Sequence, residues 1–338
     1  MKYLKSYKNK EKYVDDIRGG GNTHSIPNVA LIEDDNEKTY YDIERMSDNK
    51  SKDIWDRIKE KGWNYNTTSA ITIQELALIT SDEFNSLNET EWQNRSLVWK
   101  GLKTFDEFKY FTGVDNINAE KKDSNGNRIG GFDGAKYLES ITLPNSLKVI
   151  GDFAFNMYTH SGNTEIMDTK LKHVYGGENV EKIGSYAFQN CSGLTELNFS
   201  DNLKEIGEYA FAYCYGLVHL SVGKNIEKIG SYAFGECSAL TELNFGDKLK
   251  EIGAAAFAYL PSLATLKLGK FEVSGFINKQ PDNLFTNDTS LKDIYITSDS
   301  PSLSFVESQC VLSKIANNVT IHFGEELYTY NGSSWIKS

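Results

Sequence analysis

The sequence repeats one phrase at a fixed interval of 23 residues. The segments 181–194 (EKIGSYAFQNCSGL), 204–217 (KEIGEYAFAYCYGL) and 227–240 (EKIGSYAFGECSAL) are nearly identical. An Ile-Gly pair marks each unit, and it recurs at Ile150, Ile183, Ile206, Ile229 and Ile252. No unit of this length can bury its own apolar face, so a chain of such units folds by stacking them on one another.

The pattern inside each unit predicts a short strand followed by a tight return. In LTELNF (194–199), Leu197 and Phe199 alternate with Glu196 and Asn198, which is the period of two of a β-strand. The glycine after each isoleucine suits a turn in which a side chain would collide. We therefore expect a solenoid whose strands form a continuous parallel ladder.

Charged pairs before each Ile-Gly support this stacking. The pairs are Glu181-Lys182, Lys204-Glu205, Glu227-Lys228 and Lys250-Glu251, so the order of acid and base alternates from unit to unit. In register, each acid faces a base on the neighbouring coil, and this disfavours a slip by one unit.

The units resemble the BspA-like branch of leucine-rich repeats, on the motif I-G-x-x-A-F-x-x-C over roughly residues 105–297. The stretch TFDEFKYFTGV (104–114) is similar to the entry segment of that group. The resemblance implies an α/β solenoid, a right-handed β-rich superhelix with a small α+β N-terminal cap and a short β C-terminal cap. It also implies no catalysis, and a role in adhesion or protein binding at a bacterial cell surface.

Three regions follow from these boundaries. Residues 1–103 form the N-terminal α+β cap, with a hairpin at 28–43 and a helical segment at 49–80; residues 104–297 form the solenoid; residues 298–338 form the β cap, with a hairpin turn at Asn331-Gly332. Within the helical segment, residues 64–75 align to an EF-hand loop without its acidic ligands. Two interpretations stay open there, a degenerate calcium loop or a helical scaffold.

The motif TFDE predicts a helix start at the solenoid entrance, with Thr104 as N-cap and Glu107 three residues later. Phe105, Phe108 and Phe111 would then plug the open end of the solenoid, where an uncovered coil exposes core and strand edge.

Several kinds of chemistry find no support in the sequence. The formal net charge is −11, which argues against binding to nucleic-acid backbone. Three of the four cysteines, Cys191, Cys214 and Cys237, lie one period apart, which indicates a buried packing position rather than a metal or disulfide motif. No nucleophile, zinc or phosphate-loop motif occurs, so we expect no enzyme activity, no metal site and no cofactor.

The sequence contains no run of 18 apolar residues, so no membrane insertion is expected. The N-terminal stretch as written lacks the apolar centre of a Sec signal peptide. The resemblance nevertheless points to a cell-surface or extracellular location.

Two columns of side chains are candidate binding surfaces. The first is the outward side of the long strands, and its members are His173, Tyr175, Glu196, Asn198, His219, Ser221, Glu242, Asn244, Thr265 and Lys267. The alternative is an aromatic column of Tyr186, Tyr209 and Tyr232. Each column has a plainer interpretation, a solvated face for the first and simple ring stacking for the second.

The sequence thus predicts a non-catalytic binding module with a protein or glycan partner. The alternative function is a structural part of a phage or cell-surface appendage. The oligomeric state is not determined by the sequence.

Overall fold

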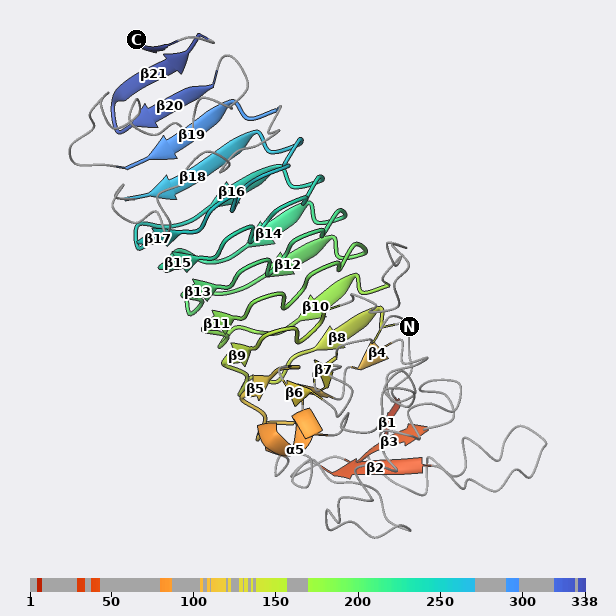
Figure 1. Cartoon of the computed structure of the whole chain (residues 1–338). Helices are drawn as coiled ribbons and strands as arrows, with labels where there is room; N and C mark the ends of the chain where they lie inside the picture. Colours follow the sequence, from red (N-terminus) through yellow and green to blue (C-terminus); the bar gives the residue numbers. More distant parts are fainter. Residues whose placement is uncertain are drawn as a thin grey trace.

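The chain forms a stack of similar coils, seen in Figure 1 as strands succeeding one another along one axis. The computed structural model describes residues 5–7, 29–33, 38–42, 80–86, 104–105, 108–109, 111–119, 121–122, 128–129, 131–132, 135, 138–156, 170–270, 290–297, 319–331 and 334–338. The helical segment expected at 49–80, with its loop at 64–75, lies outside these residues except for residue 80. Near the N-terminus, β1 (Lys5–Tyr7), β2 (Val29–Glu33) and β3 (Lys38–Asp42) form an antiparallel sheet in the order β1-β3-β2.

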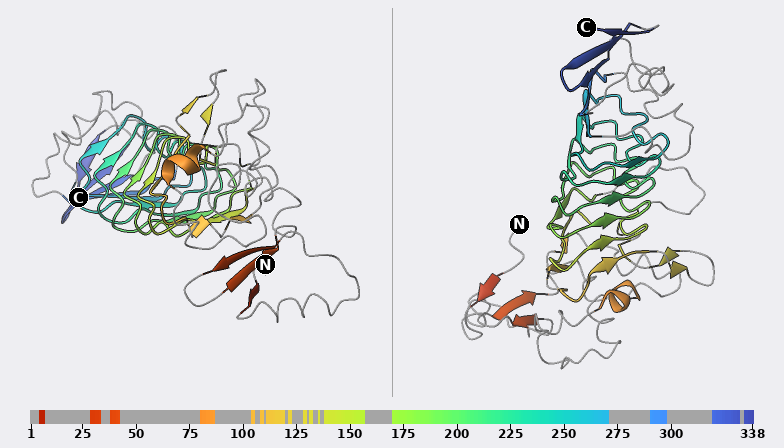
Figure 2. Two further views of the ribbon diagram at one scale, coloured as in Figure 1. Left: turned by 90° about the horizontal axis from the view of Figure 1, so that it is seen from below. Right: turned by 90° about the vertical axis from the view of Figure 1, so that its left-hand side faces the viewer.

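Two sets of parallel strands build the coils, and Figure 2 shows them stacked from two further directions. The long strands are β8 (Ser140–Thr142), β10 (His173–Tyr175), β12 (Glu196–Asn198), β14 (His219–Ser221), β16 (Glu242–Asn244), β18 (Thr265–Gly269) and β19 (Asp293–Ile296). The short strands are β5 (Asn116–Ile117), β9 (Val149–Ile150), β11 (Lys182–Ile183), β13 (Glu205–Ile206), β15 (Lys228–Ile229) and β17 (Glu251–Ile252). Equivalent residues pair from coil to coil, as Ile183 does with Ile206. The predicted parallel solenoid is confirmed.

A column of phenylalanine rings fills the centre of the stack. Phe155, Phe188, Phe211, Phe234 and Phe257 are fully buried, and consecutive rings lie 5.0–5.9 Å apart and nearly parallel. Each ring contacts its equivalents above and below, so the core is continuous although each coil is thin.

The cysteine column lies beside these rings and is buried as well. Cys191, Cys214 and Cys237 are free thiols, and each donates to a backbone carbonyl of the preceding coil at 3.0–3.3 Å. Burial raises the pKa of the Cys191 thiol far above its ordinary value. A thiol held in this protonated form is a packing group rather than a nucleophile.

The glycine after each isoleucine permits the close approach of neighbouring coils. A Cβ atom added at Gly207 would lie 2.5 Å from the backbone carbon of Gly184 and the nitrogen of Ser185 in the coil before it. Backbone atoms cannot move aside cheaply, so a larger residue here would push the coils apart.

The entrance to the solenoid is a strand rather than the expected helix start. Thr104–Phe105 forms β4, which pairs in parallel with β8 through Ser140 and Ile141. The capping-box interpretation of TFDE is therefore wrong, because the first coil uses these residues to extend the long-strand ladder.

The phenylalanines of the entrance are buried as predicted. Phe105, Phe108 and Phe111 are at most 2% exposed. Phe108 and Phe111 pack against Phe84 of α5 (Ser81–Ser86), and Phe105 packs against Phe108. Close to this end, β6 (Lys121–Lys122) and β7 (Arg128–Ile129) form a small antiparallel pair.

At the other end the parallel ladder continues past residue 297. Strand β20 (Thr320–Phe323) pairs in parallel with β19, and β21 (Glu326–Tyr330) and β22 (Trp335–Lys337) then turn back antiparallel. The change of direction ends the run of parallel coils.

The charged ladder forms at two of its three steps. Lys204 contacts Glu181 at 2.9 Å and Lys182 contacts Glu205 at 3.3 Å, while Lys228 contacts Glu251 and Lys250 contacts Glu227 at 2.9 and 2.5 Å. No ion pair joins the two middle coils of this stretch, because each lysine already has a partner on its other side. At that step the register still places Glu205 opposite Lys228, so acid faces base as predicted, but the two side chains form no ion pair.

We expect the Phe211→Ala substitution to lower the free energy of unfolding by about 3–5 kcal/mol, because it removes a fully buried ring from a stack that cannot collapse around the cavity. Chemical denaturation measures the change. Tyr175→Ala, at a side chain that is 52% exposed, is the control and should shift stability by less than about 0.5 kcal/mol. Equal effects of the two substitutions would contradict this account of the core.

The ladder also predicts a pH dependence. Hydrogen bonds from Lys204 and Lys250 lower the pKa values of Glu181 and Glu227 from the ordinary value of a glutamate. A carboxyl group whose pKa is lower in the folded chain stabilises the fold above its unfolded pKa, and this contribution is lost as the pH falls through the folded pKa. We expect the melting temperature of a variant with both residues changed to Gln to fall less than that of the parent between pH 7 and pH 3, at low salt. An equal fall in both proteins would show that the ladder adds nothing.

Candidate functional site

The outward side chains of the long strands form one polar surface, which we call the strand face. In β10, β12 and β16 the first and third residues are exposed while the middle residue is buried. His173, Glu196, His219, Glu242 and Thr265 occupy equivalent positions in successive coils, so the structure brings them into one column. A second column beside it holds Tyr175, Asn198, Ser221, Asn244 and Lys267.

The strand face is interrupted between β14 and β16. The long strands form two separate sheets, one ending at β14 and the other beginning at β16, whereas the short-strand sheet is continuous from β5 to β17. Leu220 in β14 is partly exposed, while its equivalents Leu197 and Leu243 are 1% and 0% exposed. The opening therefore affects only one side of the solenoid.

Missing backbone hydrogen bonds define this opening. The N–H of Phe199 donates to the carbonyl of Ser221 at 2.8 Å, and that of Phe245 donates to Lys267 at the same distance. Val222 holds the equivalent position in the intervening coil, and its N–H makes no such bond to Asn244 within the described residues. A smaller valine stands where the neighbouring coils have phenylalanine, and the turn that follows β14 also differs from theirs.

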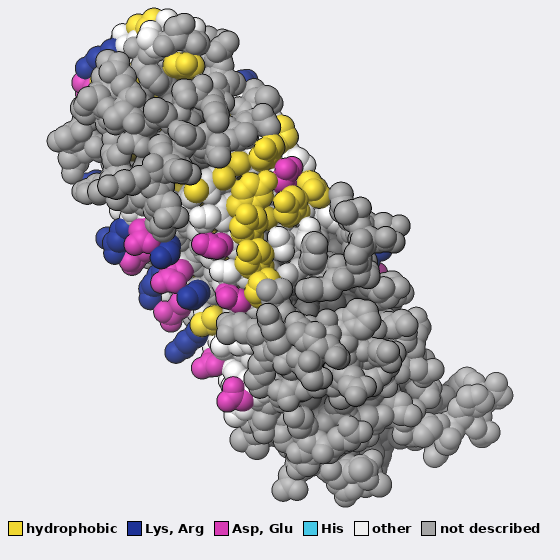
Figure 3. Space-filling model, in the orientation of Figure 1, with side chains coloured by type: hydrophobic (Ala, Val, Ile, Leu, Met, Phe, Trp, Pro, Cys, Tyr) yellow, Lys and Arg dark blue, Asp and Glu magenta, His cyan; other side chains and the backbone are white. Residues whose placement is uncertain are grey.

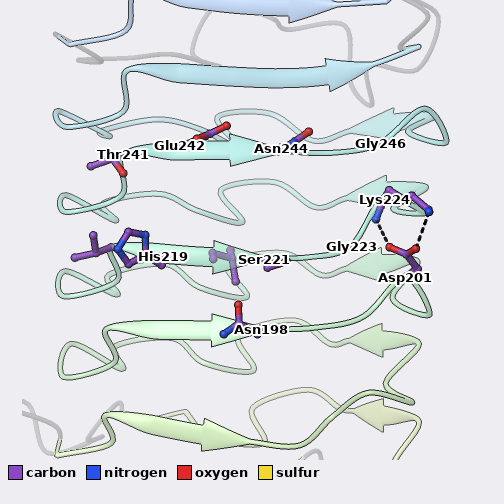
Figure 4. Close-up of a pocket in the computed structure, with 12 residues that line it drawn as sticks. Asn198, Asp201, His219, Ser221, Gly223, Lys224, Thr241, Glu242, Asn244 and Gly246 are labelled. Atoms are coloured by element: carbon purple, nitrogen blue, oxygen red, sulfur yellow. Dashed lines mark hydrogen bonds and ion pairs between the residues drawn. The ribbon is translucent and has the colours of Figure 1, made fainter.

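A hollow of about 440 Å³ lies at the opening, and Figure 4 shows its lining. Its walls come from β12, β14, β16 and the residues next to these strands. The lining residues are Asn198, Asp201, Val218, His219, Leu220, Ser221, Gly223, Lys224, Thr241, Glu242, Asn244 and Gly246. Five of the ten strand-face residues predicted from the sequence are among them. The volume is in the range of small-molecule sites, which is about 300–1,000 Å³.

The charges of the hollow are paired within the protein. Lys224 contacts Asp201 at 3.1 Å, and its backbone N–H also donates to that carboxylate and lowers the pKa of Asp201. Glu242 accepts a hydrogen bond from Lys267 at 2.8 Å, which raises the pKa of that lysine. The His219 side chain makes no hydrogen bond to any described residue. The lining therefore offers amide, hydroxyl and imidazole groups to a polar ligand rather than a strong field of one sign.

Sequence reasoning missed His322 of β20, which lies on this face at the C-terminal end, next to Asp293 and Tyr295 of β19. His322 lies 2.8 Å from the carboxylate of Asp293, and its ring stacks on that of Tyr295 at 4.1 Å. The strand register pairs Tyr295 with His322. The sequence TIHF (320–323) predicts a strand of the C-terminal cap, but the broken repeat spacing after residue 297 concealed that this strand pairs in parallel with β19.

The alternative aromatic column is a stack of rings. Phe153, Tyr186 and Tyr209 lie nearly parallel, with centroids 4.7 and 5.1 Å apart, and all are half-buried. Tyr232 continues the row but is tilted by 38° from Tyr209. The first three rings cover one another, and only the end of the row departs from regular stacking.

Neither metal chemistry nor a membrane span is indicated by the described part of the chain. There, no group of three or more His, Cys, Asp or Glu side chains is arranged to hold a metal ion. Likewise, none of the helices described is long and apolar enough to cross a membrane.

Stacked 23-residue coils with a parallel strand on each define a leucine-rich-repeat solenoid. The family model described as "BspA type Leucine rich repeat region" matches six copies, over residues 107–176 and 159–276. The chain belongs to this family. No curated protein matches the sequence.

Solved structures of bacterial repeat proteins are also similar to the chain. The leucine-rich-repeat protein of T. pallidum is 18% identical, with 54% of this chain and 64% of that chain covered and a TM-score of 0.33. The pneumococcal vaccine antigen PcpA is 18% identical over 67% of this chain and 72% of that one, with a TM-score of 0.37. A leucine-rich cell surface protein of Faecalibacterium prausnitzii is 19% identical, with 63% and 57% covered and a TM-score of 0.35. The similarity thus spans less than two thirds of the T. pallidum chain.

We expect the backbone amide of Val222 to exchange with solvent deuterium at least ten times faster than those of Phe199 and Phe245. The N–H groups of Phe199 and Phe245 donate hydrogen bonds to the next coil, whereas that of Val222 does not. Hydrogen exchange followed by NMR compares the three amides in one sample. Equal protection would show that the ladder is closed between β14 and β16 in solution.

Proposed function

We propose that this chain is a non-catalytic binding module of a bacterial cell surface, and that the strand face engages a protein or glycan ligand. Proteins of this repeat family are generally binding scaffolds, and a binding or adhesion role is the function that the family suggests. The finer assignment, to the strand face and to a ligand of either class, is our proposal.

One observation carries the proposal, the contrast between the two sides of each long strand. The inward positions hold leucine, isoleucine or valine throughout, while the outward positions change chemistry from coil to coil. Packing explains the constant side, because each inward residue fills the same place in the core. The outward side chains do not fill the core, and the hollow at β14 and β16 lies among them. A surface that varies on a constant scaffold is the arrangement with which repeat proteins recognise ligands.

The test is a binding screen of the full chain on arrays of extracellular-matrix proteins and glycans. A variant with Glu196, His219 and Glu242 changed to Ala removes three adjacent outward side chains from consecutive coils. All three are exposed, so the fold is retained, as circular dichroism checks. Residues at the centre of an interface each contribute on the order of 1–2 kcal/mol, and we therefore expect binding to weaken at least tenfold.

The matched control carries three substitutions to Ala at exposed residues outside the strand face, Glu178, Glu208 and Lys248. This control should bind as the parent does. A ligand retained by the strand-face variant would refute the proposed surface. No ligand in the screen, together with a stable multimer in light scattering, would instead favour a structural part of a phage or cell-surface appendage.

A further inference from the structure

A second surface lies at the turns that follow the short strands. Two rows of residues there have a left-handed backbone with φ between 52° and 64°. The first row is Phe153, Tyr186, Tyr209, Tyr232 and Ala255, and the second row, four residues later in each coil, is Asn190, Tyr213, Glu236 and Tyr259. Because these rows run from coil to coil, Tyr213 and Tyr259 lie in the coils on either side of Glu236.

Backbone hydrogen bonds fix this arrangement. The N–H of Tyr213 donates to the carbonyl of Gly235 at 2.9 Å, and the N–H of Glu236 donates to the carbonyl of Ala258 at 3.1 Å. This backbone arrangement brings the tyrosine rings together. The ring centroids of Tyr213 and Tyr232 are 6.2 Å apart, and those of Tyr232 and Tyr259 are 6.5 Å apart. Tyr215 meets the Tyr213 ring edge-on. We call Tyr213, Tyr215, Tyr232 and Tyr259 with Glu236 the tyrosine cluster.

Gly235 allows Tyr232 to leave the flat stack. Other coils have Gln189, Ala212 or Ala258 at this position. A Cβ atom added at Gly235 would overlap the Tyr232 ring, so the ring occupies space that only a glycine leaves. Tyr232 consequently tilts away from Tyr209 and brings its hydroxyl within 3.5 Å of the Glu236 carboxylate. The cluster is therefore centred on this one coil and does not recur along the repeat.

Glu236 is a half-buried carboxylate without a basic partner among the described residues. In contrast, the ladder carboxylates Glu181 and Glu227 each contact a lysine. Burial is the main cause that raises the pKa of Tyr213 and of Tyr215, and the negative charge of Glu236 raises both further. Both phenols therefore stay neutral. The faces of tyrosine rings are themselves electronegative and attract cations.

We propose that the tyrosine cluster binds an arginine side chain of a basic partner protein. A guanidinium group is planar, so it stacks on tyrosine rings while its N–H groups donate to the Glu236 carboxylate. The formal net charge of −11 favours association with a basic partner. Figure 3 shows a band of hydrophobic side chains along the solenoid beside its columns of charged side chains, with an acidic side chain among them. This surface differs from the strand face, and the proposal does not depend on that assignment.

The test measures binding of the full chain to an immobilised, end-blocked Gly-Ser peptide that contains one arginine, by biolayer interferometry. A second surface carries citrulline, which has the same shape without the charge. We expect binding to the arginine surface, and binding at least tenfold weaker to citrulline. Glu236→Gln should weaken arginine binding at least tenfold, and Glu178→Gln, at an exposed carboxylate elsewhere, should leave it unchanged.

Gly235→Ala is an independent variant, because the added methyl group returns the Tyr232 ring to the stack without touching the carboxylate. The backbone φ at residue 235 does not require glycine, so the variant should keep the fold. Arginine binding should fall, because the Tyr232 ring is no longer tilted towards Glu236. The variant of Glu196, His219 and Glu242 should bind arginine as the parent does, which separates this proposal from the proposed function. Absence of arginine binding in the parent, equal binding to citrulline, or full binding by Glu236→Gln would each overturn the proposal.

Discussion

Close backbone contact between successive coils is the constraint on which this structure depends. At the Ile-Gly step a Cβ atom added at Gly207 or Gly230 would lie about 2.5 Å from backbone atoms of the coil before it. That proximity allows the short strands to pair from β5 to β17 without interruption. It also sets the spacing at which the phenylalanine rings stack, the thiols reach the preceding carbonyls and the lysines reach carboxylates one coil away. Each of these interactions is weak or local, and the repeated backbone contact makes them add along the stack.

Both candidate surfaces arise where one coil departs from this regularity. Residues 194–214 and 240–260 are nearly the same sequence, and the coil between them contains the differences. Val222 replaces the phenylalanine of its neighbours and accompanies the opening of the long-strand ladder. Gly235 leaves room for the tilted Tyr232 ring. Because the short-strand sheet stays continuous beneath them, these departures alter the surface without breaking the stack.

Much of the fold could be predicted because residues one period apart in the sequence contact one another in the stack. The period of 23 residues gives the neighbours of every position, so the inward and outward strand residues, the buried cysteines and the partners of Glu181 and Lys182 followed from the sequence. The entrance was mispredicted for the opposite reason. Thr104 and Phe105 lie before the first clear repeat, and there the local capping pattern pointed to a helix while pairing with β8 made a strand.

The sequence by itself determined the stacking, the register and which side of each strand is buried, since all three depend on residue types that recur at one interval. Only the tertiary structure decided where the surface opens and which side chains meet there. The hollow beside His219 needs the failure of pairing between β14 and β16, and the cluster around Glu236 needs rings from three coils. Such features depend on how a single valine or glycine is accommodated between its neighbours. A periodic pattern describes what the coils have in common and does not contain that information.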